Sequence, residues 1–234
     1  MIRAFIETSL IDWDGKITSV FFFDRCNFRC PYCQNWRLIT HPEKFPVYEI
    51  EELFKIVLKK KNWIDGIVLT GGEPLLFPEA IMTIAEIAHK NNLKIKLDTN
   101  GSLPEELGRM LELKIVDYVA MDIKAPLDTR YFLAVGKKPQ SQPDLIDKIK
   151  KSINLLLNSD IDYEFRTTCV PGLIDEKGLR QIGAEIKGAR LWALQRYIAL
   201  NAYKKEYRNK QFDETQLQKF LEIARSIMLN VKLR

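Results

Sequence analysis

The sequence predicts an α/β fold: a partial, open (β/α)6 barrel that resembles a TIM barrel and has parallel strands. Short β-rich runs alternate six times with amphipathic helical stretches along the 234 residues, and the connections are short. Six units are fewer than the eight that close a TIM barrel, so the sheet is expected to stay open. The polar and glycine-rich motifs follow the strand ends, where parallel α/β sheets bind ligands.

The strands are predicted from runs of β-branched and aromatic residues that end in turn residues. A hairpin lead-in over residues 1–16, turning at Asp12-Trp13-Asp14-Gly15, comes before the first strand. Six strands are then expected, over residues 17–23, 66–70, 94–97, 115–123, 161–168 and 191–200.

The helices are predicted from apolar residues that recur at spacings of three and four, as at Ile50, Leu53 and Phe54. Residues 124–142 form the longest irregular stretch and are expected to cover the site. The whole chain, 1–234, is expected to form one domain that ends in a loop and helix over 201–234. The expected helices cover residues 49–60, 78–90, 104–113, 143–157, 175–187 and 213–229.

Composition narrows the class of protein. The net charge of +5, from 36 basic and 31 acidic residues, is too mild and dispersed to indicate a nucleic-acid surface. No apolar run has the length of a membrane span, and the N-terminus does not resemble a signal peptide, so a cytoplasmic protein is expected. Four cysteines in so long a chain favour reduced thiols used in metal or redox chemistry over a disulfide framework.

Chemically distinctive residues gather where the predicted strands end. Because the carboxyl ends of parallel strands share one edge of a sheet, we expect these residues to form one rim. They are Cys26, Cys30 and Cys33 after the first strand, Gly71-Gly72-Glu73-Pro74 after the second, Asp98-Thr99-Asn100-Gly101 after the third, Asp122-Ile123-Lys124 after the fourth, and Arg166 near the end of the fifth.

Three chemistries fit the cysteine spacing, C-x3-C-x2-C. A tetrahedral zinc site needs a fourth ligand, which His41 could supply. The segment Cys30-Pro31-Tyr32-Cys33 matches a dithiol redox motif, but Cys26 would then be surplus. An iron–sulfur cube held by three cysteines leaves one iron open to a substrate or cofactor.

The cysteine motif, with Tyr32 before its last cysteine, and Gly71-Gly72-Glu73-Pro74 resemble the radical S-adenosylmethionine (SAM) superfamily. Within it the chain most resembles activating enzymes of glycyl-radical enzymes, and in particular activators of anaerobic ribonucleoside-triphosphate reductase. The resemblance runs from about Ile11 to Leu200 and is carried by Ser9-Leu10-Ile11-Asp12-Trp13-Asp14-Gly15-Lys16, Cys30-Pro31-Tyr32-Cys33-Gln34-Asn35, the segment 65–74 and the segment 117–126.

The resemblance implies a [4Fe–4S] cluster on Cys26, Cys30 and Cys33, with SAM on the fourth iron. Asp98 and Asp122 are further expected to share a monovalent cation, and Cys169 is expected to be structural. The implied SAM contacts are Gly71, Gly72 and Glu73 for the ammonium, Arg166 for the carboxylate, Asn100 for the ribose, Asp122 and Lys124 beside the cofactor, and Tyr32 with the Val170 backbone bordering adenine.

The activity implied by the resemblance is reductive cleavage of SAM, followed by removal of a hydrogen atom from a glycine of a partner glycyl-radical enzyme. A small reduced electron carrier of the flavodoxin or ferredoxin type would supply the electron. Gln34 stands where the family often has histidine, which makes the partner contacts hard to transfer. A small-molecule radical SAM enzyme, such as a 7-carboxy-7-deazaguanine synthase, and a thiol-disulfide oxidoreductase stay as alternatives.

Replacement of Cys26 separates cluster chemistry from dithiol chemistry. Anaerobically purified protein is expected to be brown, with about four iron and four sulfide per chain. Cys26→Ala should lose this cluster, as measured by iron and sulfide assays and the visible spectrum. A dithiol enzyme would instead keep its activity in this variant, because Cys30 and Cys33 are still present.

Overall fold

Eight strands form one open sheet in the computed structural model, which describes residues 1–234. Their order in the sheet follows their order in the chain, β1 to β8. Strand β1 is antiparallel to β2, whereas the pairs β2–β3, β3–β4, β6–β7 and β7–β8 are parallel. The expected open, mostly parallel α/β sheet is therefore confirmed. The strands are β1 (Ile2–Ser9), β2 (Thr18–Phe23), β3 (Gly66–Gly71), β4 (Lys94–Thr99), β5 (Tyr118–Asp122), β6 (Asp162–Cys169), β7 (Trp192–Arg196) and β8 (Val231–Leu233).

Eight α-helices occur between the strands. Short 3-10 turns lie at Pro42–Lys44, Leu58–Lys60, Pro74–Leu76, Pro139–Ser141 and Lys205–Tyr207. The helices are α1 (Trp36–Thr40), α2 (Ile50–Val57), α3 (Pro78–Lys90), α4 (Pro104–Glu112), α5 (Thr129–Val135), α6 (Leu145–Leu157), α7 (Glu176–Glu185) and α8 (Glu214–Arg225).

The chain divides into two compact units, neither of which is continuous in sequence. Unit 1 contains Met1–Asn27, Arg37–Thr99 and Glu105–Val119. Unit 2 contains Phe28–Trp36, Asn100–Pro104 and Ala120–Arg234. The expectation of a single domain over 1–234 stays a prediction, and each unit is described by itself.

In unit 1 the chain begins with an antiparallel pair of strands. Strand β1 runs antiparallel to β2, with Phe5 opposite Phe21, and the turn between them has Gly15 at φ +70°. Strands β2, β3 and β4 are parallel, and the pairing of Val20 with Val68 lies at the centre of their register. Their middle residues are buried from solvent, which explains why these strands read as nearly continuous apolar runs.

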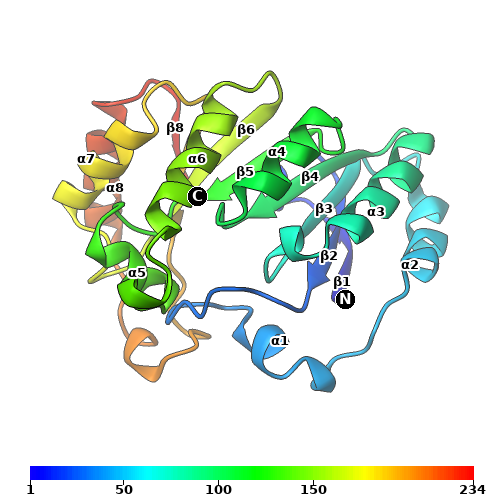
Figure 1. Ribbon diagram of the computed structural model, residues 1–234, viewed down its shortest axis with the longest axis horizontal. Helices are drawn as coiled ribbons and strands as arrows, with labels where there is room; N and C mark the ends of the chain where they lie inside the picture. Colours follow the sequence, from blue (N-terminus) through cyan, green and yellow to red (C-terminus); the bar gives the residue numbers. More distant parts are fainter. The chain divides into compact units, whose positions relative to one another are not determined.

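Helix α3 buries the apolar face that its sequence pattern predicts. It begins at Pro78, whose fixed φ suits the first turn of a helix. Its apolar stripe, Ile81, Ile84, Ala85 and Ala88, is fully buried. The helix follows β3 along the chain and contacts β3 and β4 (Figure 1).

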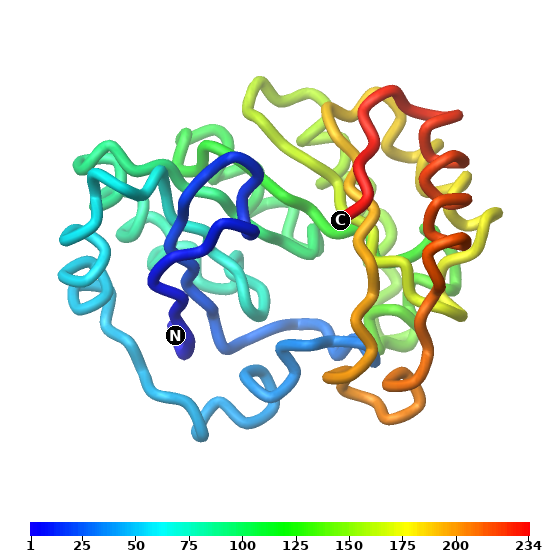
Figure 2. The backbone as a smooth tube through the Cα atoms, turned by 180° about the vertical axis from the view of Figure 1, so that it is seen from behind, coloured from blue at the N-terminus to red at the C-terminus, as the bar shows by residue number.

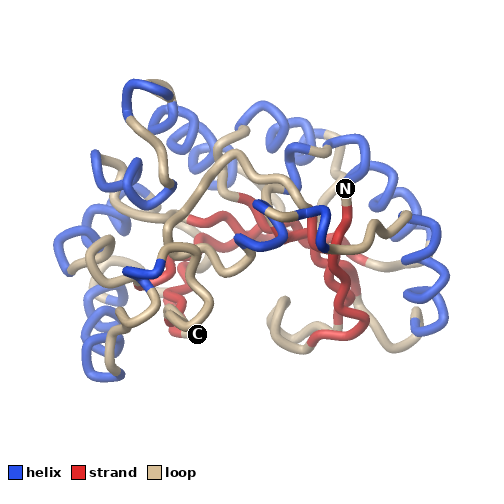
Figure 3. Tube along the Cα trace, turned by 90° about the horizontal axis from the view of Figure 1, so that it is seen from below, coloured by secondary structure: helices blue, strands red, loops and turns tan.

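In unit 2, strands β6, β7 and β8 are parallel, with Trp192 aligned between Phe165 and Val231. Helices α7 and α8 pack against each other, and α8 runs beside β8 (Figure 2). Aspartates cap both helices: Asp175 accepts from the N–H of Gly178, and Asp213 accepts from the N–H of Gln216. The helices lie outside the strands (Figure 3).

The expectation that residues 124–142 are irregular is wrong in part, because helix α5 lies within them. Its signals are local: Asp128 caps its start by accepting from the N–H of Arg130, and Gly136 ends it at φ +66°. Seven residues are too few to show a clear helical period, which is why the pattern was missed.

Other boundaries also differ. Strand β7 ends at Arg196, not at residue 200, and β5 begins at Tyr118 rather than residue 115. The three-residue strand β8 was not predicted, because its partner β7 is distant in sequence. No helix combines the length and apolarity needed to cross a membrane.

Strand β6 carries a buried carboxylate, Glu164, which is paired with Arg234 at 2.9 and 3.0 Å. Removing one partner of such a pair leaves a buried charge uncompensated. Arg234→Ala should therefore lower the free energy of unfolding by about 2 kcal/mol, less than for a fully buried pair because Arg234 is partly exposed. Denaturant unfolding measures this change. Lys90→Ala, which breaks an exposed pair with Glu86, should have little effect, and equal losses would contradict the assignment.

Candidate functional site

In unit 1, the two glycines after β3 allow the chain to approach the residues that lead into the first cysteine. Gly71 has φ +103°, which favours glycine. A Cβ at Gly72 would clash with the carbonyl oxygen of Arg25. The N–H of Gly72 donates to Phe23 O (2.8 Å), and the N–H of Glu73 donates to Arg25 O (2.6 Å). The glycine motif thus holds the backbone immediately before Cys26.

Glu73 is fully buried. Its Oε1 accepts from the N–H of Leu75 (3.2 Å) and from the hydroxyl of Thr99 (2.8 Å), at the end of β4. The carboxylate therefore starts the 3-10 turn after the glycines and joins β3 to β4. Thr99 was not expected to take part; its position beside Asn100 at a strand end was the only signal in the sequence.

In unit 2, the last two cysteines lie in one turn. The N–H of Cys33 donates to Cys30 O (3.1 Å), and Cys30 is buried whereas Cys33 is half-buried. The preceding residue, Arg29, donates its N–H to Val135 O at the end of α5 (2.9 Å). A Cβ at Gly136 would clash with Arg29 O, so α5 packs directly on the backbone that leads into Cys30.

The cysteine turn is also held by the segment that follows β7. The N–H of Lys204 donates to Pro31 O (2.8 Å), and Gln34 Nε2 donates to Ile198 O (2.8 Å). Trp36 Nε1 donates to Asn201 O (3.1 Å). Gln34 thus has a structural contact here, at the position where the resemblance led us to expect histidine.

Asp122, Lys124 and Arg166 form one ionic cluster in unit 2. Asp122 Oδ1 accepts from Arg166 Nε (2.8 Å), and Oδ2 accepts from Lys124 Nζ (3.1 Å). Burial by itself would raise the pKa of Asp122, but the two cations outweigh it and lower the pKa to about 2. Burial would lower the pKa of Lys124, but Asp122 holds it well above its ordinary value. The structure thus brings Asp122 and Lys124 into contact, and Arg166 joins them.

The same cluster faces buried thiol and phenol groups. Burial, opposed by Lys124, raises the pKa of Cys30 to about 12, so the thiol is protonated when no metal is bound. Burial likewise raises the pKa of Tyr32. The Tyr32 ring packs edge-on against Tyr197, with centroids 6.1 Å apart. Lys124 therefore supplies positive charge beside a cysteine that becomes a thiolate on binding metal.

The remaining predicted residues are placed by turns and strand ends. Asn100 is buried, and its Oδ1 accepts from the N–H of Ser102, which makes an Asx turn. Val170 is buried, and its carbonyl accepts from the N–H groups of Leu173 and Ile174. Cys169 is buried at the end of β6, in line with a structural role. His41 is exposed and lies 3.6 Å from Glu43.

Asp98 has a basic neighbour of its own. In unit 1 it pairs with the buried Lys96 at 3.3 Å. The ammonium of Lys96 also donates to Asp12 O, next to the Tyr118 ring. Asp98 and Asp122 thus belong to different units, and each faces a basic side chain.

The comparison with protein families gives the identity of this arrangement. The model described as "Radical SAM superfamily" matches residues 20–179, which include all three cysteines and the glycine motif. The chain belongs to the radical SAM superfamily. It is therefore a radical SAM enzyme, and the family implies a [4Fe–4S] cluster and SAM.

Two relatives of this radical SAM enzyme match most of its length. A Methanocaldococcus jannaschii protein, provisionally named a glycyl-radical enzyme activating enzyme, is 31% identical over 235 residues, covering 100% of this chain and 95% of its own. The pyruvate formate-lyase-activating enzyme of Clostridium pasteurianum is 30% identical over 200 residues, covering 81% of this chain and 77% of its own.

Solved radical SAM structures share the fold. A radical SAM methyltransferase from Sphaerobacter thermophilus superposes with a TM-score of 0.73 at 17% identity, over 97% of this chain and 68% of its own. Streptococcus suis SuiB bound to S-adenosylmethionine gives 0.69 at 14% identity, over 92% of this chain and 49% of its own. At these identities the likeness shows the fold alone, an open partial barrel.

The residue types present fit the implied cluster, although no three cysteine, histidine or carboxylate side chains are gathered so that they could hold a metal ion in this structure. The donor set is three cysteines, which suits an iron–sulfur cube with one iron free for SAM. In unit 1, Gly72 packs against the carbonyl of Arg25, the residue before Cys26. In unit 2, Gly136 packs against the carbonyl of Arg29, the residue before Cys30. Lys124 offsets the negative charge of the thiolate at Cys30.

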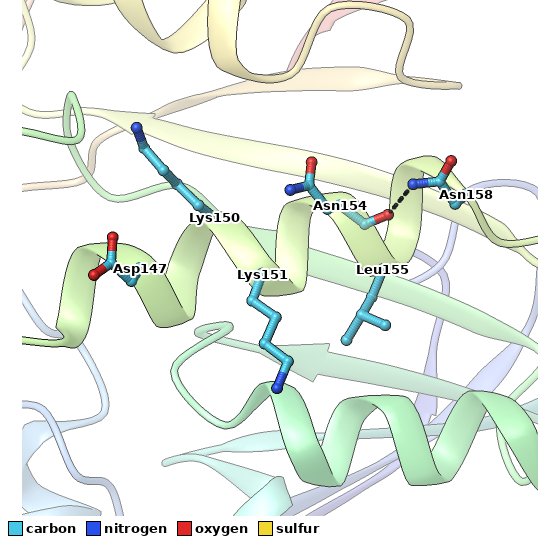
Figure 4. A pocket seen from close by; sticks show the side chains of 6 residues that line it. All are labelled: Asp147, Lys150, Lys151, Asn154, Leu155 and Asn158. Atoms are coloured by element: carbon cyan, nitrogen blue, oxygen red, sulfur yellow. Dashed lines mark hydrogen bonds between the residues drawn. The ribbon is translucent and has the colours of Figure 1, made fainter.

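A surface hollow in unit 2 lies apart from all of these residues. It runs along the outer face of α6, where Asn158 Nδ2 donates to Asn154 O (Figure 4). The residues that line it come from this helix and its C-cap, Asn158, and none of them is a predicted site residue: Asp147, Lys150, Lys151, Asn154, Leu155 and Asn158.

The low pKa of Asp122 predicts a pH dependence. Its folded-state pKa, about 2, lies below the ordinary 3.8, so its ion pairs contribute stability above about pH 4 that is lost as pH falls through 2. That contribution is about 2 kcal/mol for the metal-free protein. Between pH 4 and 2, Asp122→Asn should therefore lose less stability than wild type in denaturant unfolding. Parallel curves for the two proteins would contradict the predicted shift.

Proposed function

We propose that this radical SAM enzyme is an activating enzyme for a glycyl-radical enzyme, with anaerobic ribonucleotide reductase as the partner. The observation that carries the proposal is the match to the Methanocaldococcus jannaschii protein over the whole chain. Pyruvate formate-lyase-activating enzyme, whose name states the same kind of task, supports it. Both relatives are matched over more than two thirds of their own length, so the shared region is most of each protein.

When bound, the cluster and SAM supply the one-electron chemistry that removes a hydrogen atom from a glycine Cα of the partner. The work of this chain is to bind, orient and shield. Cys26, Cys30 and Cys33 would hold the irons. The backbone of Gly71 and Gly72 would receive the SAM ammonium, because carbonyls unscreened by side chains can approach it closely.

The ionic cluster of unit 2 is proposed to orient SAM. Arg166, whose Nε donates to Asp122, would bind the SAM carboxylate through its planar guanidinium group. Lys124 would stay charged beside the cofactor, consistent with its raised pKa. Glu73, Asn100, Tyr32 and the Val170 backbone complete the proposed cofactor contacts.

A bound monovalent cation and an external electron donor are two further components proposed for this enzyme. A monovalent cation near Asp98 and Asp122 is proposed on the resemblance alone, and the ion pairs of these carboxylates with Lys96 and Lys124 argue against a strong site. A small reduced carrier of the flavodoxin or ferredoxin type is proposed as the electron donor.

A second candidate keeps the radical chemistry but acts on a small molecule. The 7-carboxy-7-deazaguanine synthase of Methanothermobacter thermautotrophicus is 31% identical over 173 residues, covering 69% of this chain and 63% of its own. The shorter match makes this candidate weaker. A thiol-disulfide oxidoreductase is not carried further, because it would leave Cys26 and the glycine motif without a role.

Electron paramagnetic resonance tests the proposal. Cluster-loaded protein, reduced by dithionite and mixed with SAM and anaerobic ribonucleotide reductase, should give the doublet of a glycyl radical. Cys30→Ala serves as the control without a complete cluster and should give no doublet.

Cleavage of SAM without a doublet would contradict the assignment of this partner. Mass spectrometry for 7-carboxy-7-deazaguanine then tests the second candidate. Failure to cleave SAM at all, in protein with a full complement of iron, would contradict the radical chemistry itself.

A further inference from the structure

The segment after β7, residues 197–210, concentrates positive charge, and we call it the basic strap. It holds four basic residues and one acidic residue, Glu206, which gives it +3 of the chain's net +5. No carboxylate pairs with these cations: two lysines lie over tyrosine rings, and the arginine donates to backbone carbonyls. Their charge is therefore available to a partner. The four are Lys204, Lys205, Arg208 and Lys210.

The basic strap has a fixed structure. Arg208 Nε donates to Ala202 O (2.9 Å), and the hydroxyl of Tyr197 donates to Tyr207 O (3.0 Å). A 3-10 turn spans Lys205–Tyr207. A run of like charges that is only solvated needs no such internal bonds. The cations are thus held in a set arrangement, which lowers the entropic cost of binding a partner.

Large apolar and aromatic side chains lie on the same segment. Ile198 is 59% exposed and Leu200 is 76% exposed. Trp36, which is bonded to Asn201 O, contacts the ring of Tyr203 with centroids 5.5 Å apart. Apolar and aromatic residues bordered by charged ones are typical of protein–protein interfaces, whereas a solvated charged face has no need of the apolar residues.

The basic strap is also attached to the cysteine turn, and both belong to unit 2. The N–H of Lys204 donates to the carbonyl of Pro31, the residue after Cys30 (2.8 Å). The ring of Tyr197 packs edge-on against Tyr32, the next residue of the turn. The strap, in orange, lies beside the blue segment that carries the turn in both Figure 1 and Figure 2. One hydrogen bond thus separates this surface from the backbone of a cluster ligand.

We propose that the basic strap is the docking surface for a small acidic electron-transfer protein that reduces the cluster. One electron leaves the reduced flavin or iron–sulfur group of that carrier and enters the oxidised cluster, which becomes more negative by one charge. Electron transfer weakens steeply with distance, so the carrier has to dock close to the cysteine turn. Opposite charge speeds the encounter, and electron-transfer complexes are small enough for one short segment to matter.

This inference rests on the cluster of the proposed function and gives its electron donor a place to bind. A glycyl-radical partner has to deliver its glycine to SAM, which we place beside Arg166 and Asp122 rather than on the strap. A nucleic acid would also be attracted by the cations, but the exposed aliphatic side chains of Ile198 and Leu200 favour a protein.

The double variant Lys205→Glu/Lys210→Glu tests the docking surface. It reverses two exposed charges whose side chains make no hydrogen bond, and it leaves the backbone bond of Lys204 in place. The probe is flavodoxin, a small acidic flavoprotein, at low ionic strength. Calorimetry with oxidised flavodoxin and cluster-loaded enzyme should show binding weakened about tenfold. Stopped-flow reduction by reduced flavodoxin should slow by a similar factor, and added salt should narrow the difference.

Arg180→Glu/Lys187→Glu is the matched control. These two exposed basic residues lie outside the strap, on and just after α7 in unit 2, and their reversal changes the net charge equally. Binding and reduction by flavodoxin should stay close to wild type. Dithionite, a small reductant that needs no docking surface, should reduce all three proteins at the same rate and support the same SAM cleavage. Loss of SAM cleavage with dithionite would thus signal failure of the radical chemistry instead.

Equal weakening in the two variants would overturn the inference, because net charge rather than the strap would then steer the carrier. Slower reduction of the strap variant by dithionite would also overturn it, since the strap would then support the cluster. So would wild type that accepts electrons neither from flavodoxin nor from an acidic ferredoxin. Unchanged flavodoxin binding, with weaker binding of the glycyl-radical partner, a second copy of this chain or poly(U) RNA, would assign the strap to that occupant and contradict the proposal.

Discussion

Backbone hydrogen bonds on either side of the cysteines are the constraint on which the rest of the site depends. Peptide carbonyls at Arg25 and Pro31 accept from Glu73 and Lys204, and the N–H of Arg29 donates to Val135. Each contact comes from the end of a strand or helix, so regular elements hold a loop that has little secondary structure of its own. Within each unit, the backbone next to the cysteines is thus held before any metal binds.

Charge in unit 2 follows from the same arrangement. Cys30 is buried where a thiolate would be costly, and Lys124 is the cation that offsets it. Lys124 is in turn held by Asp122, which Arg166 also binds. In the metal-free protein the two cations thus exceed the single carboxylate, and a bound iron–sulfur cluster would add negative charge beside them. Asp122 and Arg166 meet because β5 and β6 are neighbours in the sheet.

Most of the regular structure was predictable because its signals are periodic or local. The stripe of α3, the aspartate caps of α7 and α8 and the turn at Gly15 all follow from short-range physical chemistry. Helix α5 was missed because seven residues give no clear period, although Asp128 and Gly136 marked both of its ends. Strand β8 was missed because only pairing with β7 makes three residues a strand.

The sequence by itself determined the donor set, the cofactor family and the strand ends that carry them, since cysteine spacing and glycine motifs are local patterns with specific chemistry. Tertiary structure decided which groups meet. It joined Arg166 to Asp122, gave Glu73 the hydroxyl of Thr99, and brought Gln34 to Ile198, 164 residues away. No local pattern encodes these pairings, because they depend on which strands and loops become neighbours when the sheet assembles.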